Sequence, residues 1–246
     1  MGVLARFGED PTPPSLGELG RDLLVRALLP ALGLMGLGLG VGWLVVVPLA
    51  VTTREDDLNV ALQATRTPPL DALALTASAI GGVTGNAVLC VLAVALLWAL
   101  SRRWWLAALP FIALQLHIGV HIVTSTLVGR QRPDVPNLDV GQPTASFPSG
   151  HMGATTAQLL VVALFLCHRF GSRAARIIVV GVTTAYLLVL GWSRLYLGMH
   201  HLSDVVWGAL NGVVCGLIAW LFLRRDPTRT AGPELGTGAD PVEASG

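Results

Sequence analysis

Residues 104–129 read WWLAALPFIALQLHIGVHIVTSTLVG, a stretch of 26 residues without Asp, Glu, Lys or Arg. A helix needs about 20 mainly apolar residues to cross the hydrocarbon core of a bilayer. The stretch therefore predicts a membrane-spanning helix over about 104–128. Arg103 precedes it and Arg130 follows it, so a charge stands at each end of the predicted span.

The same pattern recurs along the chain. Five more charge-free runs of 27, 30, 29, 17 and 19 residues lie between Arg26 and Arg54, Asp71 and Arg102, Asp139 and Arg169, Arg176 and Arg194, and Asp204 and Arg224. Only 13% of the 246 residues are charged, against roughly 25% in soluble domains. We predict an all-α fold, an integral membrane bundle of six transmembrane helices. This composition excludes an ordinary soluble enzyme and a disordered chain.

The net charge of +1 gives no electrostatic attraction for nucleic acid. The bilayer is the partner that the composition indicates, and the sequence sets no oligomeric state.

The spans divide the chain into three parts. Six helices are predicted at about 27–51, 82–101, 104–128, 149–168, 175–192 and 204–223. Residues 1–26 form a predicted polar cytoplasmic lead, 27–224 the membrane domain, and 225–246 a flexible cytoplasmic tail.

Residues 52–70 are polar and fit a short surface helix, and 70–80 fit an interfacial or re-entrant piece. Gly33, Gly36, Gly38 and Gly40 are spaced for close helix contact.

Arginine positions predict the orientation. All 16 basic residues are Arg, and cytoplasmic loops are enriched in positive charge. An N-terminus in the cytoplasm places 11 of the 16 arginines on that side. The other five, Arg54, Arg66, Arg130, Arg132 and Arg194, are then outside. Six spans return the C-terminus to the cytoplasm.

Three segments interrupt the apolar pattern with polar residues. They are 129–134 (GRQRPD), 146–151 (SFPSGH) and 193–204 (SRLYLGMHHLSD). Although they are far apart in sequence, the predicted topology puts all three at the outer face. We therefore expect them to form one site.

The residue types in these segments suit an oxyanion. Arg132 and Arg194 provide two guanidinium forks, which match the oxygens of a phosphate. Ser149 and Gly150 stand at a helix start, where free backbone N–H groups favour an anion. This part of the site is expected to bind phosphate.

Two histidines and a carboxylate complete the set. His200 and Asp204 are four residues apart, so on a helical turn the carboxylate can hold one ring nitrogen and leave the other free to attack. His151 is a second imidazole, available as a general acid. The combination suits phosphoryl transfer without a metal, through positioning and charge stabilisation.

These motifs resemble the type 2 phosphatidic acid phosphatase superfamily, membrane lipid phosphatases related to vanadium haloperoxidases. That family has a Lys seven residues before the Arg of an Arg-Pro, then Pro-Ser-Gly-His, then Ser-Arg, five residues, His, three residues and Asp. This chain carries Arg132-Pro133, the motif PSGH at 148–151, Ser193-Arg194, His200 and Asp204 at those spacings. The resemblance covers about residues 70–220.

The resemblance implies roles for these residues. His200 would be the nucleophile that forms a phosphohistidine, Asp204 would orient it, and His151 would protonate the leaving oxygen and then activate water. Arg132, Arg194, Ser149 and Gly150 would bind the phosphate, with neither metal nor cofactor. The implied substrates are polyprenyl diphosphate, phosphatidic acid and phosphatidylglycerol phosphate, reached from the outer leaflet of a bacterial plasma membrane.

One position departs from the family pattern. Ser125 stands where the family has its lysine. Arg130, two residues before Arg132, is expected to supply the missing charge as a further phosphate ligand.

Several polar residues admit two interpretations. His117 and His121 lie one helical turn apart. They could form a metal pair or be neighbours of the site, or they could be bundle-facing side chains with hydrogen-bond partners. The second is favoured, with His121 beside the site. His201 is expected to be a neighbour rather than a participant. The acids 55–57 fit a solvated loop better than a cation site.

Two other functions remain open from the sequence. The first is a phosphotransferase that passes the phosphate to an acceptor other than water. The second is a non-catalytic lipid-binding or transport protein on the same scaffold, which the presence of His151, Arg194, His200 and Asp204 together disfavours. A haloperoxidase is disfavoured because those relatives are soluble.

Overall fold

The computed structural model describes residues 15–46, 51–139 and 144–222. All regular structure in these ranges is helical. The elements are α1 (Leu16–Asp22), the π-helix η2 (Leu23–Leu28), α2 (Leu29–Val46), α3 (Val51–Gln63), α4 (Pro68–Gly81), α5 (Val83–Ser101), α6 (Trp104–Ala107), α7 (Leu109–Val128), α8 (Gly150–Phe170), α9 (Arg173–Tyr196) and α10 (Leu202–Phe222). The predicted all-α class is confirmed for the described ranges.

Six helical segments are long and apolar enough to cross a bilayer. They are Leu16–Leu44, Val83–Ser101, Trp104–Val128, Gly150–Phe170, Arg173–Tyr196 and Leu202–Leu221. They match the six predicted spans in number and order, so the prediction of a six-helix membrane bundle is confirmed.

The first helix begins at Leu16, well before the predicted start at residue 27. Ser15 Oγ accepts from the Glu18 N–H at 3.3 Å, and Glu18 accepts from the Ser15 N–H at 3.0 Å. This reciprocal capping box starts a helix in polar sequence, where apolar periodicity gives no signal. The rest of the predicted lead (1–14), residues 47–50 and the predicted tail lie outside the described residues.

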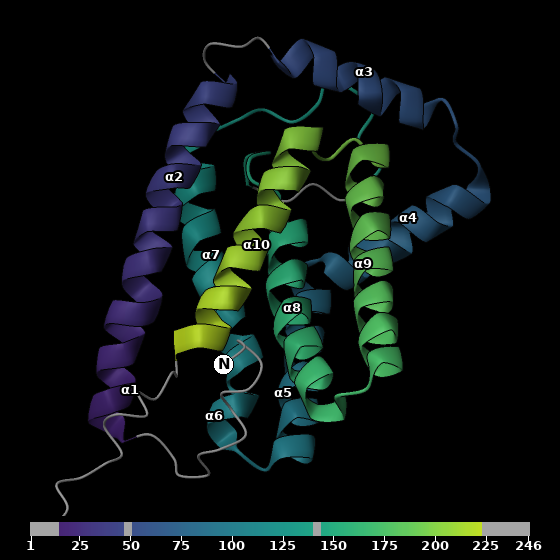
Figure 1. Ribbon diagram of the computed structural model, residues 1–246. Coiled ribbons are helices and arrows are strands. Elements are labelled where there is room, and N and C mark those ends of the chain that lie inside the picture. Colours follow the sequence, from purple (N-terminus) through teal and green to yellow (C-terminus); the bar gives the residue numbers. More distant parts are fainter. Residues whose placement is uncertain (1–14, 47–50, 140–143, 223–246) are drawn as a thin grey trace, which may run out of the picture.

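Two helices that are not spans lie between the first and second spans. The polar segment predicted as a surface helix forms α3, and the stretch predicted as interfacial or re-entrant forms α4. Thr67 caps the start of α4, and Gly82 follows its last residue as the C-terminal cap. Figure 1 shows α3 lying across one end of the bundle, with the α5–α6 and α8–α9 connections at the opposite end.

Helix α8 lies at the centre of the bundle, in contact with α5, α7, α9 and α10. Its buried face includes Ala157, Val161 and Phe165, which belong to the main apolar core together with Ala219 and Trp220 of α10. The helix that begins with the Pro-Ser-Gly-His motif is therefore held on several sides.

Glycines bring α10 close to α8. A Cβ on Gly212 would come within 2.4 Å of the Gly153 carbonyl oxygen, and one on Gly208 within 2.6 Å of the Ser149 carbonyl oxygen. Only residues without a side chain allow helices to approach so closely. The glycine row fixes the N-terminus of α10, with Asp204, beside the N-terminus of α8.

The glycine row predicted for the first helix has a smaller role. Gly33, Gly36 and Gly40 have no atom within 4 Å of an added Cβ. Of the four predicted positions only Gly38 meets a neighbour, since its Cβ would lie 3.3 Å from Trp207 Nε1. The expectation of a four-glycine contact surface is therefore wrong.

Candidate active site

The three polar segments meet at the end of the bundle that α3 covers. The Ser146 N–H donates to the Arg130 carbonyl at 2.8 Å, and the Ser149 N–H donates to the Asp204 carbonyl at 3.0 Å. Backbone hydrogen bonds thus join the first segment to the second and the second to the third.

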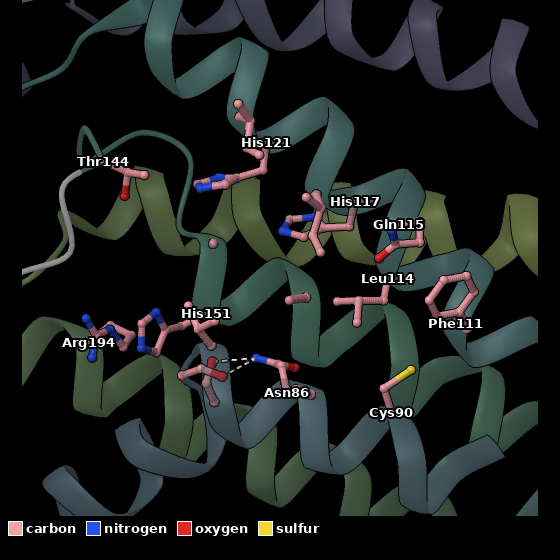
Figure 2. A pocket seen from close by; sticks show the side chains of 18 of the residues that line it. Asn86, Cys90, Phe111, Leu114, Gln115, His117, His121, Thr144, His151 and Arg194 are labelled. Atoms are coloured by element: carbon pink, nitrogen blue, oxygen red, sulfur yellow. Dashed lines mark hydrogen bonds between the residues drawn. The ribbon is translucent and has the colours of Figure 1, made fainter. Parts of the chain in front are cut away.

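A cavity of about 630 Å³ opens between α5, α7 and α8 beside these segments. Its polar end is lined by Arg132, Gly150, His151, Arg194 and His200. Its apolar wall includes Val91, Phe111, Leu114, Ile118 and Ile122. Figure 2 shows His151 beside Arg194, with Leu114 and Phe111 farther along the cavity. The cavity can hold an anionic headgroup at one end and an apolar chain along the other.

His200 is held by a backbone carbonyl. Its side chain is buried, and Nδ1 lies 2.7 Å from the Ser146 carbonyl oxygen. A carbonyl oxygen can only accept, so Nδ1 carries the proton and Nε2 keeps its lone pair. Burial lowers the pKa of His200 to about 4, against the opposing effect of the nearby Asp204 carboxylate. His200 is therefore neutral at pH 7, the form a nucleophile requires.

Asp204 lies beside His200 without a direct hydrogen bond to its ring. The Asp204 Oδ2 atom lies 3.8 Å from His200 Nδ1, beyond hydrogen-bond distance. It accepts instead from the Ser146 hydroxyl at 2.6 Å and from the His201 N–H at 2.8 Å. The hydrogen bond from His200 to Asp204 that the four-residue spacing predicts is therefore absent, and donors from two different segments bind Asp204 Oδ2 instead.

Arg130 differs most from its expected place. Its side chain is 1% exposed, and it is not among the residues that line the cavity. Nη1 donates to Asp204 Oδ1 at 2.7 Å, and Nη2 donates to Glu55 Oε2 at 2.7 Å. A buried guanidinium needs such counter-charges. The structure thus corrects the expectation of a phosphate ligand, since the Arg130 fork is used by two carboxylates.

Arg132 lines the cavity and is half-buried. Nη1 donates to the Met199 carbonyl at 2.5 Å and Nη2 to the Thr144 carbonyl at 3.1 Å. No carboxylate pairs with this guanidinium among the ion pairs of the described residues. Its positive charge is therefore available to an anion in the cavity.

Arg194 enters the cavity from α9. Nη1 donates to Asp139 Oδ2 at 2.7 Å and to the Ser78 hydroxyl, and Nε is buried without a hydrogen-bond partner in the described ranges. Asp139 and Ser78 therefore fix one branch of the fork against the wall.

The start of α8 provides less free backbone than expected. Ser149 precedes the helix, but its N–H donates to the Asp204 backbone carbonyl. Its hydroxyl is buried and has no hydrogen-bond partner among the described residues. Gly150 lines the cavity as the first residue of α8. A Cβ on Gly150 would lie 2.9 Å from His121 Nε2, so this position requires glycine to keep the histidine in place.

His117 and His121 both line the cavity, with ring centroids 5.7 Å apart (Figure 2). They are neighbours of the site, and the favoured interpretation with hydrogen-bond partners does not fit His117, because neither of its ring nitrogens has a hydrogen-bond partner within the described ranges. In those ranges no three His, Cys, Asp or Glu residues gather as metal ligands. Ser125 is buried in α7 and does not line the cavity.

The acids 55–57 are not the solvated loop that was expected. Glu55 pairs with Arg130, Asp56 Oδ1 lies 3.1 Å from His201 Nε2, and only Asp57 is exposed. His201 is indeed a neighbour, since its other ring nitrogen lies 3.1 Å from Asp204. In a chain with few charges, three adjacent acids are themselves a signal of ion pairs within the fold.

The fold and the site together define the class: an integral membrane protein whose helices enclose two arginines and two histidines beside an apolar cavity. The chain belongs to the PAP2 superfamily, whose family model matches residues 104–227, half of the chain. That range includes every motif residue named from the sequence.

Similar curated proteins occur in mycobacteria. Decaprenylphosphoryl-5-phosphoribose phosphatase of Mycobacterium tuberculosis is 36% identical over 124 residues, which cover 48% of this chain and 60% of that protein. The enzyme of the same name from Mycolicibacterium smegmatis is 36% identical over 115 residues, 44% of this chain and 54% of that protein. The chain thus spans 54–60% of the length of the curated relatives it matches.

Two solved structures share the fold. The transmembrane PAP2-type phosphatidylglycerolphosphate phosphatase from Bacillus subtilis superposes with a TM-score of 0.68 at 22% identity, covering 83% of this chain and 98% of that one. Aquifex aeolicus LpxE gives a TM-score of 0.54 at 23% identity, covering 66% of this chain and 92% of that one. At such identities the likeness concerns the fold.

Proposed function

We propose that the protein is a membrane lipid phosphatase that hydrolyses a phosphomonoester or pyrophosphate of a lipid through a phosphohistidine at His200. The observation that carries the proposal is the cavity, whose cationic and imidazole end adjoins an apolar wall inside a membrane protein. Two guanidinium groups line that end, suited to phosphate oxygens. The apolar wall suits a lipid chain.

The reaction is proposed to proceed in two steps. His200 Nε2 attacks phosphorus and forms an N–P bond as the P–O bond to the lipid breaks, while protonated His151 gives its proton to the leaving oxygen. His151 then takes a proton from a water whose oxygen attacks phosphorus, and the N–P bond breaks to release phosphate. Arg132 and Arg194 stabilise the charge on the transferring group, with the start of α8 at Gly150. This charge stabilisation is the reason we propose that no metal is required.

The proposed substrates carry a phosphate on an amphiphile. Polyprenyl diphosphate, phosphatidic acid and phosphatidylglycerol phosphate all present such a group. The names of the mycobacterial relatives favour a polyprenyl-linked phosphate. The arginine distribution supports termini in the cytoplasm of a bacterial plasma membrane and a site that faces the outside.

Purified protein in detergent micelles is expected to release inorganic phosphate from at least one of these lipids in the presence of EDTA. Vanadate, which mimics the five-coordinate phosphorus of the transition state, is expected to inhibit the release. A panel of the three lipids ranks the substrates, and a labelled alcohol acceptor detects transfer in place of hydrolysis. Loss of activity with EDTA and its return with a divalent cation would contradict the metal-free mechanism.

The neutral state of His200 gives a prediction for pH. Burial lowers its pKa to about 4, below the ordinary value of about 6.5, so the ring stays unprotonated as the pH falls from 8 to about 5. The measurement is an NMR titration of ¹³C,¹⁵N-labelled histidine, with the His200 signal assigned by its loss in His200→Gln. A His200 titration near pH 6.5 would show that the ring is not held in this environment.

A further inference from the structure

Glu55 on α3 makes three hydrogen bonds to residues behind the cavity. Oε1 accepts from the Ser203 N–H at 2.7 Å. Oε2 accepts from the Ser203 hydroxyl at 2.9 Å and from Arg130 Nη2 at 2.7 Å. The Glu55 side chain is 12% exposed, so these contacts are largely protected from water. Both carboxylate oxygens of Glu55 thus accept hydrogen bonds from Ser203 or Arg130.

These contacts continue to the His200 ring. Arg130 Nη1 donates to Asp204 Oδ1 at 2.7 Å, and Asp204 Oδ2 accepts from the Ser146 hydroxyl at 2.6 Å. The Ser146 carbonyl accepts from His200 Nδ1 at 2.7 Å. Short hydrogen bonds through Arg130, Asp204 and the side chain and backbone of Ser146 therefore link Glu55 to the imidazole across four segments of the chain.

Glu55 also fixes the helix that carries Asp204. Ser203 is the second residue of α10, and its N–H is one of the donors that a helix start leaves unsatisfied. A carboxylate at that end is stabilised by the helix dipole. Glu55 thereby sets both the position of the α10 start and the direction of the Arg130 fork.

The charges around Arg130 favour the proposed intermediate. Glu55 and Asp204 place two negative charges on one buried guanidinium, which leaves one formal negative charge in the group. When Nε2 of His200 bonds to phosphorus while Nδ1 keeps its proton, the ring becomes cationic. An excess negative charge whose nearest oxygen, Asp204 Oδ2, lies 3.8 Å from His200 Nδ1 stabilises that cation by electrostatic attraction.

We propose that Glu55 is a positioning residue for His200. Glu55 holds Arg130 and the start of α10 in place, and the Ser146 carbonyl can then keep the imidazole in the tautomer that attacks phosphorus. The inference rests on the proposed function. α3 lies outside residues 104–227, the part that the family model matches. The next turn of the same helix supports the role, because Asn59 Nδ2 donates to the His200 carbonyl at 3.1 Å and to the Leu195 carbonyl at 2.8 Å.

The test is Glu55→Gln, which keeps the shape and replaces one acceptor oxygen by an NH₂ donor. That donor must face either the Ser203 N–H or the Arg130 fork, both of which are donors themselves. Misplacing a reacting group slightly costs up to about 100-fold in rate, so we expect kcat to fall by roughly 10- to 100-fold. KM is expected to stay within about threefold, because the Arg132 and Arg194 contacts to the phosphate are unchanged.

Asp57→Asn is the matched control. It makes the same acid-to-amide change on the same helix at an exposed position, and kcat is expected to match the wild type. Detergent gel filtration and thermal unfolding check that each variant folds. If Glu55→Gln yields no folded protein, Glu55→Asp keeps the charge, shortens the reach by one methylene, and is judged by the same criteria.

A second readout separates this inference from the proposed function. The ¹⁵N shifts of the His200 ring report which nitrogen carries the proton, whether or not the protein turns over a lipid. We expect only the Nδ1–H form in the wild type and in Asp57→Asn, and a mixture of tautomers in Glu55→Gln. If the wild type releases no phosphate, the proposed function fails and these shifts alone decide the positioning role. Unchanged shifts, an unchanged kcat, or an effect confined to KM would overturn it.

Discussion

Replacing His200 by alanine is expected to lower kcat by a factor on the order of 10⁴ or more. The physical reason is that the variant lacks the nucleophile. A water molecule in its place is a weaker nucleophile than the His200 imidazole, and its lone pairs are not fixed in direction. The Nδ1 contact to the Ser146 carbonyl at 2.7 Å is what holds that direction in the wild type. The measurement is phosphate release in micelles, together with rapid quench of the ³²P-labelled, acid-labile phosphoenzyme, which should be absent from the variant.

His168→Ala is the matched control for this substitution. His168 lies in the last turn of α8, at the opposite end of that helix from Gly150, and the variant should retain the activity and the phosphoenzyme of the wild type. A His200→Ala protein that still forms a labelled phosphoenzyme would reject the proposed nucleophile.

Arg130→Ala is expected mainly to lower the stability of the folded protein. Its guanidinium separates two carboxylates, Glu55 and Asp204, and its removal leaves both without a counter-charge in a buried place. Breaking a buried ion pair in this way costs about 3–5 kcal/mol. We expect a large fall in the unfolding temperature in detergent and a loss of most activity, since Asp204 is no longer fixed.

Arg132→Ala provides the contrast. Arg132 donates only to backbone carbonyls, those of Met199 and Thr144, and it lines the cavity. Its loss should leave the unfolding temperature near that of the wild type and lower kcat/KM by about 10²-fold, because a donor to the transferring phosphoryl group is missing. If Arg130→Ala instead folds like the wild type and loses activity only through KM, Arg130 would be the phosphate ligand that the sequence first indicated.

The fold could be predicted from the sequence to a large extent. Each span is a long run of apolar residues without charges, and hydropathy alone determines such a helix because an unpaired charge in the bilayer is costly. The error at the first helix came from a polar start at Ser15 and Glu18, where local hydrogen bonds and not hydropathy begin the helix.

The polar end of the cavity could also be predicted in part. His151, Arg194 and His200 stand in short motifs whose spacing is local, and the structure brings all three to the same cavity. The contacts behind them could not be read from the sequence. Glu55 stands in the acidic cluster 55–57 and Asp139 in a polar loop, and the sequence does not say which arginine each one meets.

The sequence by itself determined the six membrane spans, the segments that interrupt them and the residue types suited to a phosphate, because each depends on composition or on neighbours along one helix. Only the tertiary structure decided where Arg130 and Arg132 lie and which groups they contact. The two arginines are two residues apart, yet one is enclosed by carboxylates from α3 and α10 while the other lies at the cavity. The difference arises because a buried charge is defined by the partners that packing brings to it, and those partners lie more than 70 residues away.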